Sequence, residues 1–94
     1  MNKYITEVNR VNNGVQKIYQ FENGYGASVI SHDYSYGGKK GLWELAVLVS
    51  DGSICYDTEI TEDVIGHLND PEVDRYLRRI QQLWKIRKNV QWVR

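Results

Sequence analysis

Positively charged side chains gather at one end of this 94-residue chain, where they could bind a polyanion or an acidic surface. Residues 75–94 carry seven of the twelve Lys and Arg residues and no Asp or Glu, whereas residues 1–74 carry all twelve carboxylates and five cations. The net charge of zero is therefore −7 followed by +7. Such an end can bind nucleic acid, an acidic protein or the acidic part of its own chain, and the sequence leaves these alternatives open.

Most of these cations fall on one face of a predicted long helix, opposite its apolar stripe. The residues of this basic face are Arg75, Arg78, Arg79, Gln82, Lys85 and Lys88. A row of this kind can follow phosphates, with an exposed aromatic side chain such as Trp92 stacking on bases. It is also typical of a solvated helix face, because cations near a helix C-terminus complement the helix dipole.

A second candidate binding segment, residues 33–41, combines Tyr34, Tyr36, Lys39 and Lys40 with three glycines. Tyr, Ser and Gly are favoured in adaptable binding loops, so the segment predicts a partner-binding surface. Its Gly-Gly-Lys-Lys-Gly run could instead hold a phosphate, although it lacks the spacing of a P-loop and does not open a predicted helix. A plain hairpin loop is the third interpretation.

Catalytic and metal-binding residue types occur, but in no supporting pattern. Residues 31–33 (Ser-His-Asp) hold the residue types of a hydrolase triad, yet neighbours in a strand point to opposite faces and cannot form one. A metal held by His32 and His67 would need a third ligand, which Asp57 or Glu59 could supply, but the ligand spacing does not support a site. We therefore expect no enzyme, no metal and no cofactor.

The remaining reactive groups have simpler interpretations. The carboxylates of Asp57, Glu59, Glu62 and Asp63 lie near the start of a predicted helix, where stabilisation by the helix dipole explains them more simply than acid–base catalysis. Cys55 is the single cysteine, which excludes an intramolecular disulfide and a cysteine-based metal cluster. We interpret it as a small apolar strand residue.

Turn signals and apolar periodicity predict the elements that position these groups. The predicted strands are Val15–Phe21, Tyr25–His32, Leu42–Val49 and Ile54–Asp57. The pair Asn23-Gly24 predicts a type I′ hairpin turn between the first two strands, and residues 50–53 predict a second hairpin. Leu42–Val49 is apolar on both faces and should be central in the sheet.

Two helices should follow the strands. A short helix is predicted over about 61–68, and a longer one from an N-cap at Asp70, with Pro71 at its first position, to about Lys88. The apolar stripe of the long helix comprises Val73, Tyr76, Leu77, Ile80, Leu83 and Trp84. The fold class is therefore α+β, ββββαα: an antiparallel sheet of about four strands with two C-terminal helices on one face. We expect one domain over residues 1–94, with residues 1–13 and 89–94 as loosely held ends.

Composition and hydropathy limit the location of the protein. The longest uncharged apolar run, Leu45–Val49, is too short to span a bilayer, and the N-terminus has no apolar signal-peptide core. We therefore expect a cytoplasmic protein without a membrane partner. Trp84, Trp92 and Val93 form more apolar surface than a small monomer readily covers, so a homodimer stays open.

Several segments together resemble a group of small proteins of unassigned function encoded by tailed bacteriophages. The matching residues are Tyr19–Val29 (YQFENGYGASV), Gly41–Leu48 (GLWELAVL), Asp51-Gly52, Tyr56–Thr58 and Ile60–Gly66 (ITEDVIG). The resemblance covers about residues 17–80 and implies a phage product acting in the bacterial host cytoplasm. It implies no activity and no catalytic residues. The basic tail after Trp84 departs from the usual pattern.

These observations favour a non-enzymatic phage accessory protein that binds a host protein or ribonucleoprotein complex. Its action would be occlusion of a host surface, as in an anti-CRISPR-like inhibitor of host defence. The expected contact residues are Tyr34, Tyr36, Lys39, Lys40, Arg78, Arg79, Lys85 and Arg87. The alternative is a small nucleic-acid-binding protein that uses the same cations with Trp92. A small phage enzyme or structural accessory is a third class, which no motif supports.

Overall fold

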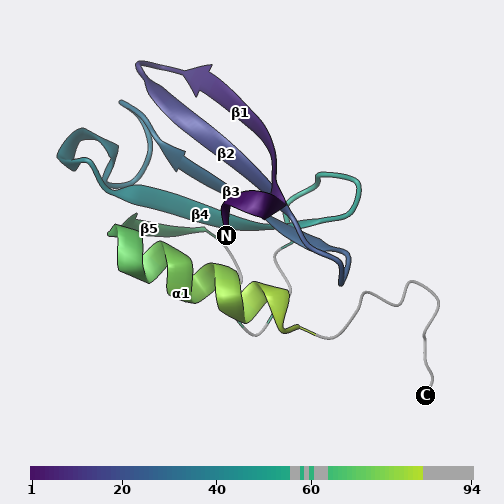
Figure 1. The fold of residues 1–94 in the computed structure, drawn as a ribbon. Helices are drawn as coiled ribbons and strands as arrows, with labels where there is room; N and C mark the ends of the chain where they lie inside the picture. Colours follow the sequence, from purple (N-terminus) through teal and green to yellow (C-terminus); the bar gives the residue numbers. More distant parts are fainter. Residues whose placement is uncertain (56–57, 59, 61–63, 84–94) are drawn as a thin grey trace.

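The computed structural model describes residues 1–55, 58, 60 and 64–83, and they form an α+β fold. A five-stranded antiparallel sheet runs in the order β1-β2-β3-β4-β5, and helix α1 covers one face of it (Figure 1). The strands are β1 Ile5–Val11, β2 Gly14–Gln20, β3 Tyr25–Ser31, β4 Trp43–Val49 and β5 Ile65–Leu68. The helices are the 3-10 turns η1 Asn2–Tyr4 and η2 Gly38–Lys40, and α1 Asp70–Gln81.

Three of the predicted strands are confirmed as β2, β3 and β4. β4 is an interior strand, because β3 pairs with it on one side and the edge strand β5 on the other. Its apolar residues alternate between faces, and both faces are largely buried at this strand. The antiparallel α+β class is confirmed, whereas the expected four strands and two helices become five strands and one α-helix among the described residues.

The additional strand, β1, lies within residues 1–13, which the sequence suggested as a loosely held end. It pairs with β2 through a two-residue turn, in which Asn12 has φ 42° and Asn13 has φ 65°. Two successive positive φ values are the signature of a type I′ turn, and asparagine tolerates them. Among the described residues the type I′ turn is therefore formed by Asn12-Asn13, eleven residues before the Asn-Gly pair.

The hairpin at Asn23-Gly24 is confirmed, but its predicted type I′ geometry is wrong. Only Gly24 has a positive φ, at 93°, and its N–H donates to the Phe21 carbonyl at 3.3 Å. Phe21 N–H in turn donates to the Tyr25 carbonyl at 2.8 Å. This is a three-residue loop with glycine in the left-handed position. The Asn23 backbone does not adopt a left-handed conformation in this loop, and its side-chain amide bonds to the end of α1.

Residues 65–68 form strand β5, so the helix predicted over 61–68 is wrong at this end; residues 61–63 lie outside the described part of the chain. Trp43 and Leu45, two residues apart in β4, pair with Leu68 and Ile65, which are three residues apart. The extra residue is a bulge at which His67 adopts φ 57°. The bulge places Ile65 and Leu68 on one face, so their helix-like spacing is compatible with a strand.

The predicted fourth strand is reduced to a single bridge between Ile54 and Leu48. Cys55 N–H donates to the Val47 carbonyl at 2.7 Å, and its half-buried side chain packs against the core. The turn before it has Gly52 at φ 90°. Residues 56–57, at the end of the predicted strand, lie outside the described residues.

Helix α1 begins one residue earlier than predicted, because Asn69 and not Asp70 is its N-cap. The Asn69 side chain accepts a hydrogen bond from Glu72 N–H, and the Glu72 side chain accepts one from Asn69 N–H, both at 2.9 Å. This capping box stabilises the helix start by about 1 kcal/mol. Pro71 is the second helical residue. The helix ends at Gln81, and the predicted continuation to Lys88 falls largely on residues 84–94, which the structure does not describe.

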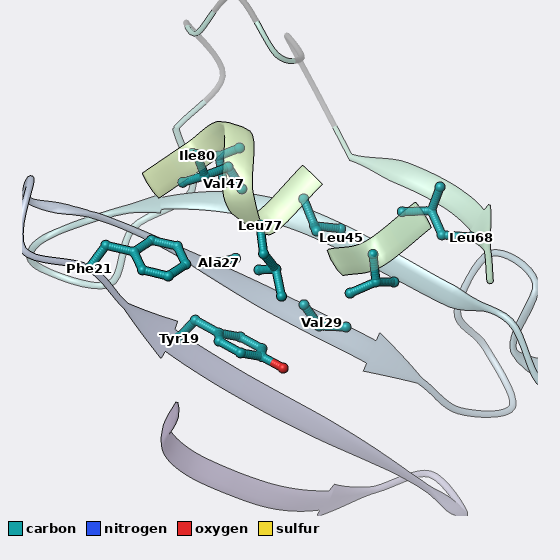
Figure 2. Close-up of a cluster of buried hydrophobic side chains, with 10 residues drawn as sticks. Tyr19, Phe21, Ala27, Val29, Leu45, Val47, Leu68, Leu77 and Ile80 are labelled. Atoms are coloured by element: carbon teal, nitrogen blue, oxygen red, sulfur yellow. The ribbon is translucent and has the colours of Figure 1, made fainter. Parts of the chain in front are cut away.

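The hydrophobic core lies between α1 and the sheet. Figure 2 shows side chains from β2, β3 and β4 directed toward Leu77 and Ile80 of the helix. The buried core residues are Tyr19, Phe21, Ala27, Val29, Leu45, Val47, Leu68, Val73, Leu77 and Ile80. Tyr4 of η1 closes one end, where its ring meets that of Phe21 edge-on at 5.1 Å and its hydroxyl accepts from Gln81 at 2.8 Å.

Burial of Tyr19 makes stability depend on alkaline pH. Burial, and secondarily the negative charge of Asp74, raises the pKa of Tyr19 above its ordinary value of 10.0. The folded state therefore holds this proton more tightly than the unfolded state. The resulting stabilisation is fully present below pH 10.0 and is lost as the pH rises above it.

We therefore expect the free energy of unfolding to fall more between about pH 9 and 11 in the wild type than in Tyr19→Phe, which cannot ionise there. Urea unfolding at several pH values measures both slopes. Equal slopes for the two proteins would contradict this assignment.

Candidate functional site: the β3–β4 loop

The β3–β4 loop, residues 32–42, carries four of the predicted contact residues and forms the candidate site. Figure 1 shows it beyond the ends of β3 and β4, at the end of the sheet where α1 begins. Tyr34 and Tyr36 are 80% and 60% exposed, the two largest values among the aromatic residues that the structure describes. Lys39 and Lys40 of η2 are also exposed. Large exposed aromatic side chains on a loop are typical of binding surfaces.

Hydrogen bonds within the loop define its backbone. Ser35 Oγ accepts from His32 N–H at 2.9 Å and donates to the His32 carbonyl at 3.0 Å. Gly38 N–H donates to the Ser35 carbonyl at 3.1 Å, and Leu42 N–H to the Gly37 carbonyl at 3.0 Å. These bonds close consecutive turns, so the loop is a folded substructure although it contains three glycines.

Two of the glycines are required by this conformation for different reasons. Gly37 has φ 91°, a value that other residues rarely adopt. Gly38 has no such φ, but a Cβ there would collide with the His32 carbonyl. The Gly-Gly run is therefore explained by a left-handed conformation at Gly37 and by the close approach of Gly38 to His32.

Strand β5 fixes the loop from the side. Tyr36 carbonyl accepts from His67 N–H at 3.1 Å, and Tyr36 N–H donates to a Glu44 carboxylate oxygen at 2.9 Å. Gly66 gives the space for this contact, since a Cβ on it would overlap Cβ of Tyr36. The backbone of Tyr36 is thus held by both β4 and β5 while its ring stays exposed.

His67 is the residue of this site that sequence reasoning did not assign to binding. A shallow hollow of about 330 Å³ is lined by Asp33, Tyr34, Ser35, Gly37, Lys39, Lys40 and His67. His67 joins it from β5 through its left-handed backbone conformation, which is uncommon for a residue other than glycine. The only local signal in the sequence was the glycine that precedes His67. A glycine at that position does not indicate that the β3–β4 loop would lie beside His67.

The site combines two lysines with two carboxylates that already accept hydrogen bonds. Asp33 accepts a hydrogen bond from the Asn13 side chain at 2.9 Å, and Glu44 accepts from Tyr36 N–H. The side chains of Lys39 and Lys40 make no ion pair or hydrogen bond with the described residues, although Lys40 N–H donates to the Gly37 carbonyl at 3.0 Å. Their ammonium groups remain available to an acidic partner.

The predicted contact residues on α1 lie apart from the loop. Arg78 donates to Asp74 at 2.8 Å, and this hydrogen bond lowers the pKa of the Asp74 carboxyl below its ordinary range. The Arg79 guanidinium lies 5.6 Å from the centre of the Tyr76 ring. Both arginines follow Asp70 by two turns or more, about 12 Å along the axis, so they occupy the opposite end of α1 from the loop. Lys85, Arg87 and Trp92 lie outside the described residues.

The structure places the remaining candidate residues in ordinary roles. His32 Nδ1 accepts from Tyr34 N–H at 3.0 Å, so it serves the loop and not a triad with Ser31 and Asp33. Within the described ranges no three His, Cys, Asp or Glu residues lie close enough to hold a metal ion; Asp57 and Glu59 are not among those ranges. No helix in this part of the chain is long and apolar enough to cross a membrane.

Comparisons of the chain with protein-family models, with curated proteins and with solved structures found no match.

Proposed function

We propose that this protein is a non-enzymatic binding protein that attaches to a host protein or ribonucleoprotein complex through the β3–β4 loop. One observation carries the proposal: Tyr34 and Tyr36 are largely exposed although the backbone N–H groups of both are hydrogen-bonded. Packing of the described residues does not require an exposed aromatic loop to be held in one conformation. Such ordering is what a pre-organised contact surface requires.

Pre-organisation has a direct energetic consequence for binding. Tyrosine buries a large area while losing little conformational freedom, and a loop already fixed by Ser35 and by β5 adds little ordering cost. The unpaired ammonium groups of Lys39 and Lys40 would steer an acidic surface toward the tyrosines and accelerate association. The favoured partner is therefore a protein surface with carboxylates around an apolar patch.

The resemblance to tailed-phage proteins supports the biological setting of the proposal. The protein would act in the bacterial host cytoplasm, as an anti-CRISPR-like inhibitor or a related antagonist of host defence. It would act by covering a working surface of the host complex. No chemical step is needed for such occlusion.

Nucleic-acid binding is the competing function, because three exposed arginines share one face of α1. Arg75, Arg78 and Arg79 follow the spacing of neighbouring turns, and Arg75 makes no ion pair with the described residues. Arg78 already donates to Asp74, which reduces the cation available to phosphates. Salt dependence distinguishes the two functions, since phosphate contacts weaken steeply as salt rises.

The test starts from capture of host partners by the tagged protein, followed by calorimetry with the purified partner. We expect Tyr34→Ala with Tyr36→Ala to weaken affinity by about a hundredfold, and Lys39→Glu with Lys40→Glu to slow association. Gly38→Ala retains both tyrosines but should weaken affinity similarly, because its Cβ displaces the loop. Arg75→Ala is the matched surface control.

Two results would refute the proposal. The first is a partner affinity that is unchanged in the double tyrosine variant while circular dichroism shows a folded protein. The second is retention of duplex or single-stranded nucleic acid with a steep salt dependence that disappears on substitution of Arg75 and Arg79. The latter result would support the competing function.

A further inference from the structure

The two edges of the sheet differ in how open they are. β5 has four residues, is interrupted at His67 and has its N–H at that position bound to the Tyr36 carbonyl. β1 has seven residues, contains neither proline nor lysine, and is the outermost strand in Figure 1. Proteins normally protect a long edge strand with such residues or with a covering segment. β1 has a bulge near its start, between Ile5 and Glu7, and carries Glu7 and Arg10. From Glu7 to Val11 its pairing with β2 is regular, and among the described residues no strand pairs with its outer edge.

The turn between β1 and β2 determines which backbone groups point outward. A two-residue turn makes Val11 and Gly14 a hydrogen-bonded pair. Since such pairs alternate along an antiparallel ladder, Val8 opposite Lys17 and Arg10 opposite Val15 are not hydrogen-bonded pairs. The N–H and C=O groups of Val8 and Arg10 therefore point away from β2, and no partner for them occurs among the described residues.

The side chains of β1 complement a second copy of the same strand. In an antiparallel pair centred on Val8, the two Val8 residues face each other as a hydrogen-bonded pair. Glu7 then lies opposite the second copy's Asn9, within the part of β1 that pairs regularly with β2. No like charges are opposed in this register. Val8, which is 61% exposed on its own, would gain an apolar neighbour across the axis.

We infer that two copies of this chain associate through β1, antiparallel and about a two-fold axis at Val8, to form one continuous sheet. The axis is perpendicular to the sheet, so α1 of both copies lies on the same face. Closed two-fold pairing occupies both copies' β1 edges and therefore stops at the dimer. The dimer carries two β3–β4 loops, so it can engage a repetitive partner bivalently.

Sedimentation equilibrium of the full chain from about 1 µM to about 1 mM tests the inference. The wild type should approach twice the 11.0 kDa monomer mass as concentration rises. Val8→Lys should raise the dimer dissociation constant by about tenfold or more, because it opposes two ammonium groups at the axis. Val8→Thr, which keeps the branched strand-forming shape, should leave it within about threefold.

Crosslinking provides a second readout that does not depend on the lysine variant. With Cys55 replaced by alanine, Val8→Cys should form a reducible dimer on mild oxidation, since facing hydrogen-bonded residues lie about 5.5 Å apart between Cα atoms. Asn12→Cys, at the far end of the hairpin, should not. A wild type that stays monomeric, a dimer insensitive to Val8→Lys, or equal crosslinking at both positions would each overturn the inference. Failure of either binding proposal leaves the other intact, because Val8 is not part of the β3–β4 loop.

Discussion

Replacing Leu77 with alanine is expected to lower the free energy of unfolding by about 3 kcal/mol. Leu77 is 2% exposed and points from the middle of α1 into the core (Figure 2). The buried residues of the helix are Val73, Leu77 and Ile80, so truncating the central one removes a large part of its contact with the sheet. A chain of 94 residues has a total stability of about 5–14 kcal/mol, which makes this a large fraction.

Chemical denaturation with urea, followed by tryptophan fluorescence, measures this loss. Arg75→Ala is the matched control, since it places the same residue at an exposed position of the same helix and should change stability by about 0.5 kcal/mol or less. A loss below about 1 kcal/mol in Leu77→Ala, with an unchanged denaturant slope, would contradict the packing of α1 on the sheet.

Replacing Asn23 with aspartate is expected to lower the free energy of unfolding by about 3 kcal/mol. Asn23 Nδ2 lies 2.8 Å from the Ile80 carbonyl oxygen and 3.1 Å from those of Gln81 and Leu83. Asn23 therefore joins the β2–β3 hairpin to the end of α1. A carboxylate cannot donate to these oxygens, and its charge would face the negative end of the helix dipole.

Alanine at the same position separates the lost bonds from the added charge. Asn23→Ala should lose about 2 kcal/mol, because the carbonyl groups keep access to water at this half-buried position. The excess loss in the aspartate variant should shrink as the pH falls toward about 4 and be absent below it, because the carboxyl at the negative end of the helix protonates in the folded state before it does in the unfolded state. Asn2→Asp, at an exposed position of η1, is the control and should be nearly neutral. Equal stability of Asn23→Asp and wild type at pH 7 would refute the capping role.

The exposed residues of the candidate β3–β4 loop could be predicted from composition, but its geometry could not. Tyr34, Tyr36, Lys39 and Lys40 are all exposed, as the residue types indicated. The loop is held by the close approach of Gly38 to His32. It is also held by the contact of Tyr36 with Gly66 and His67, some thirty residues later in the chain. Contacts of that separation leave no periodic signal in the chain, so the histidine in the hollow was missed.

Local sequence determined the elements whose signals are short-range. Strands β2, β3 and β4 follow from alternating apolar residues, and the start of α1 from the Asn-Asp-Pro-Glu run, to within one residue. These features depend on steric and hydrogen-bonding preferences of neighbours in sequence, which is why they can be recognised without coordinates.

Tertiary structure decided the elements whose local signals were ambiguous. Ile65 and Leu68 have the spacing of a helix, but pairing with β4 and a bulge at His67 make them a strand. β1 has little apolar periodicity of its own and exists because β2 satisfies its backbone groups on one side. In both cases hydrogen bonds to a distant strand outweigh a local preference of a few tenths of a kcal/mol per residue, and those partners are brought together only by the fold.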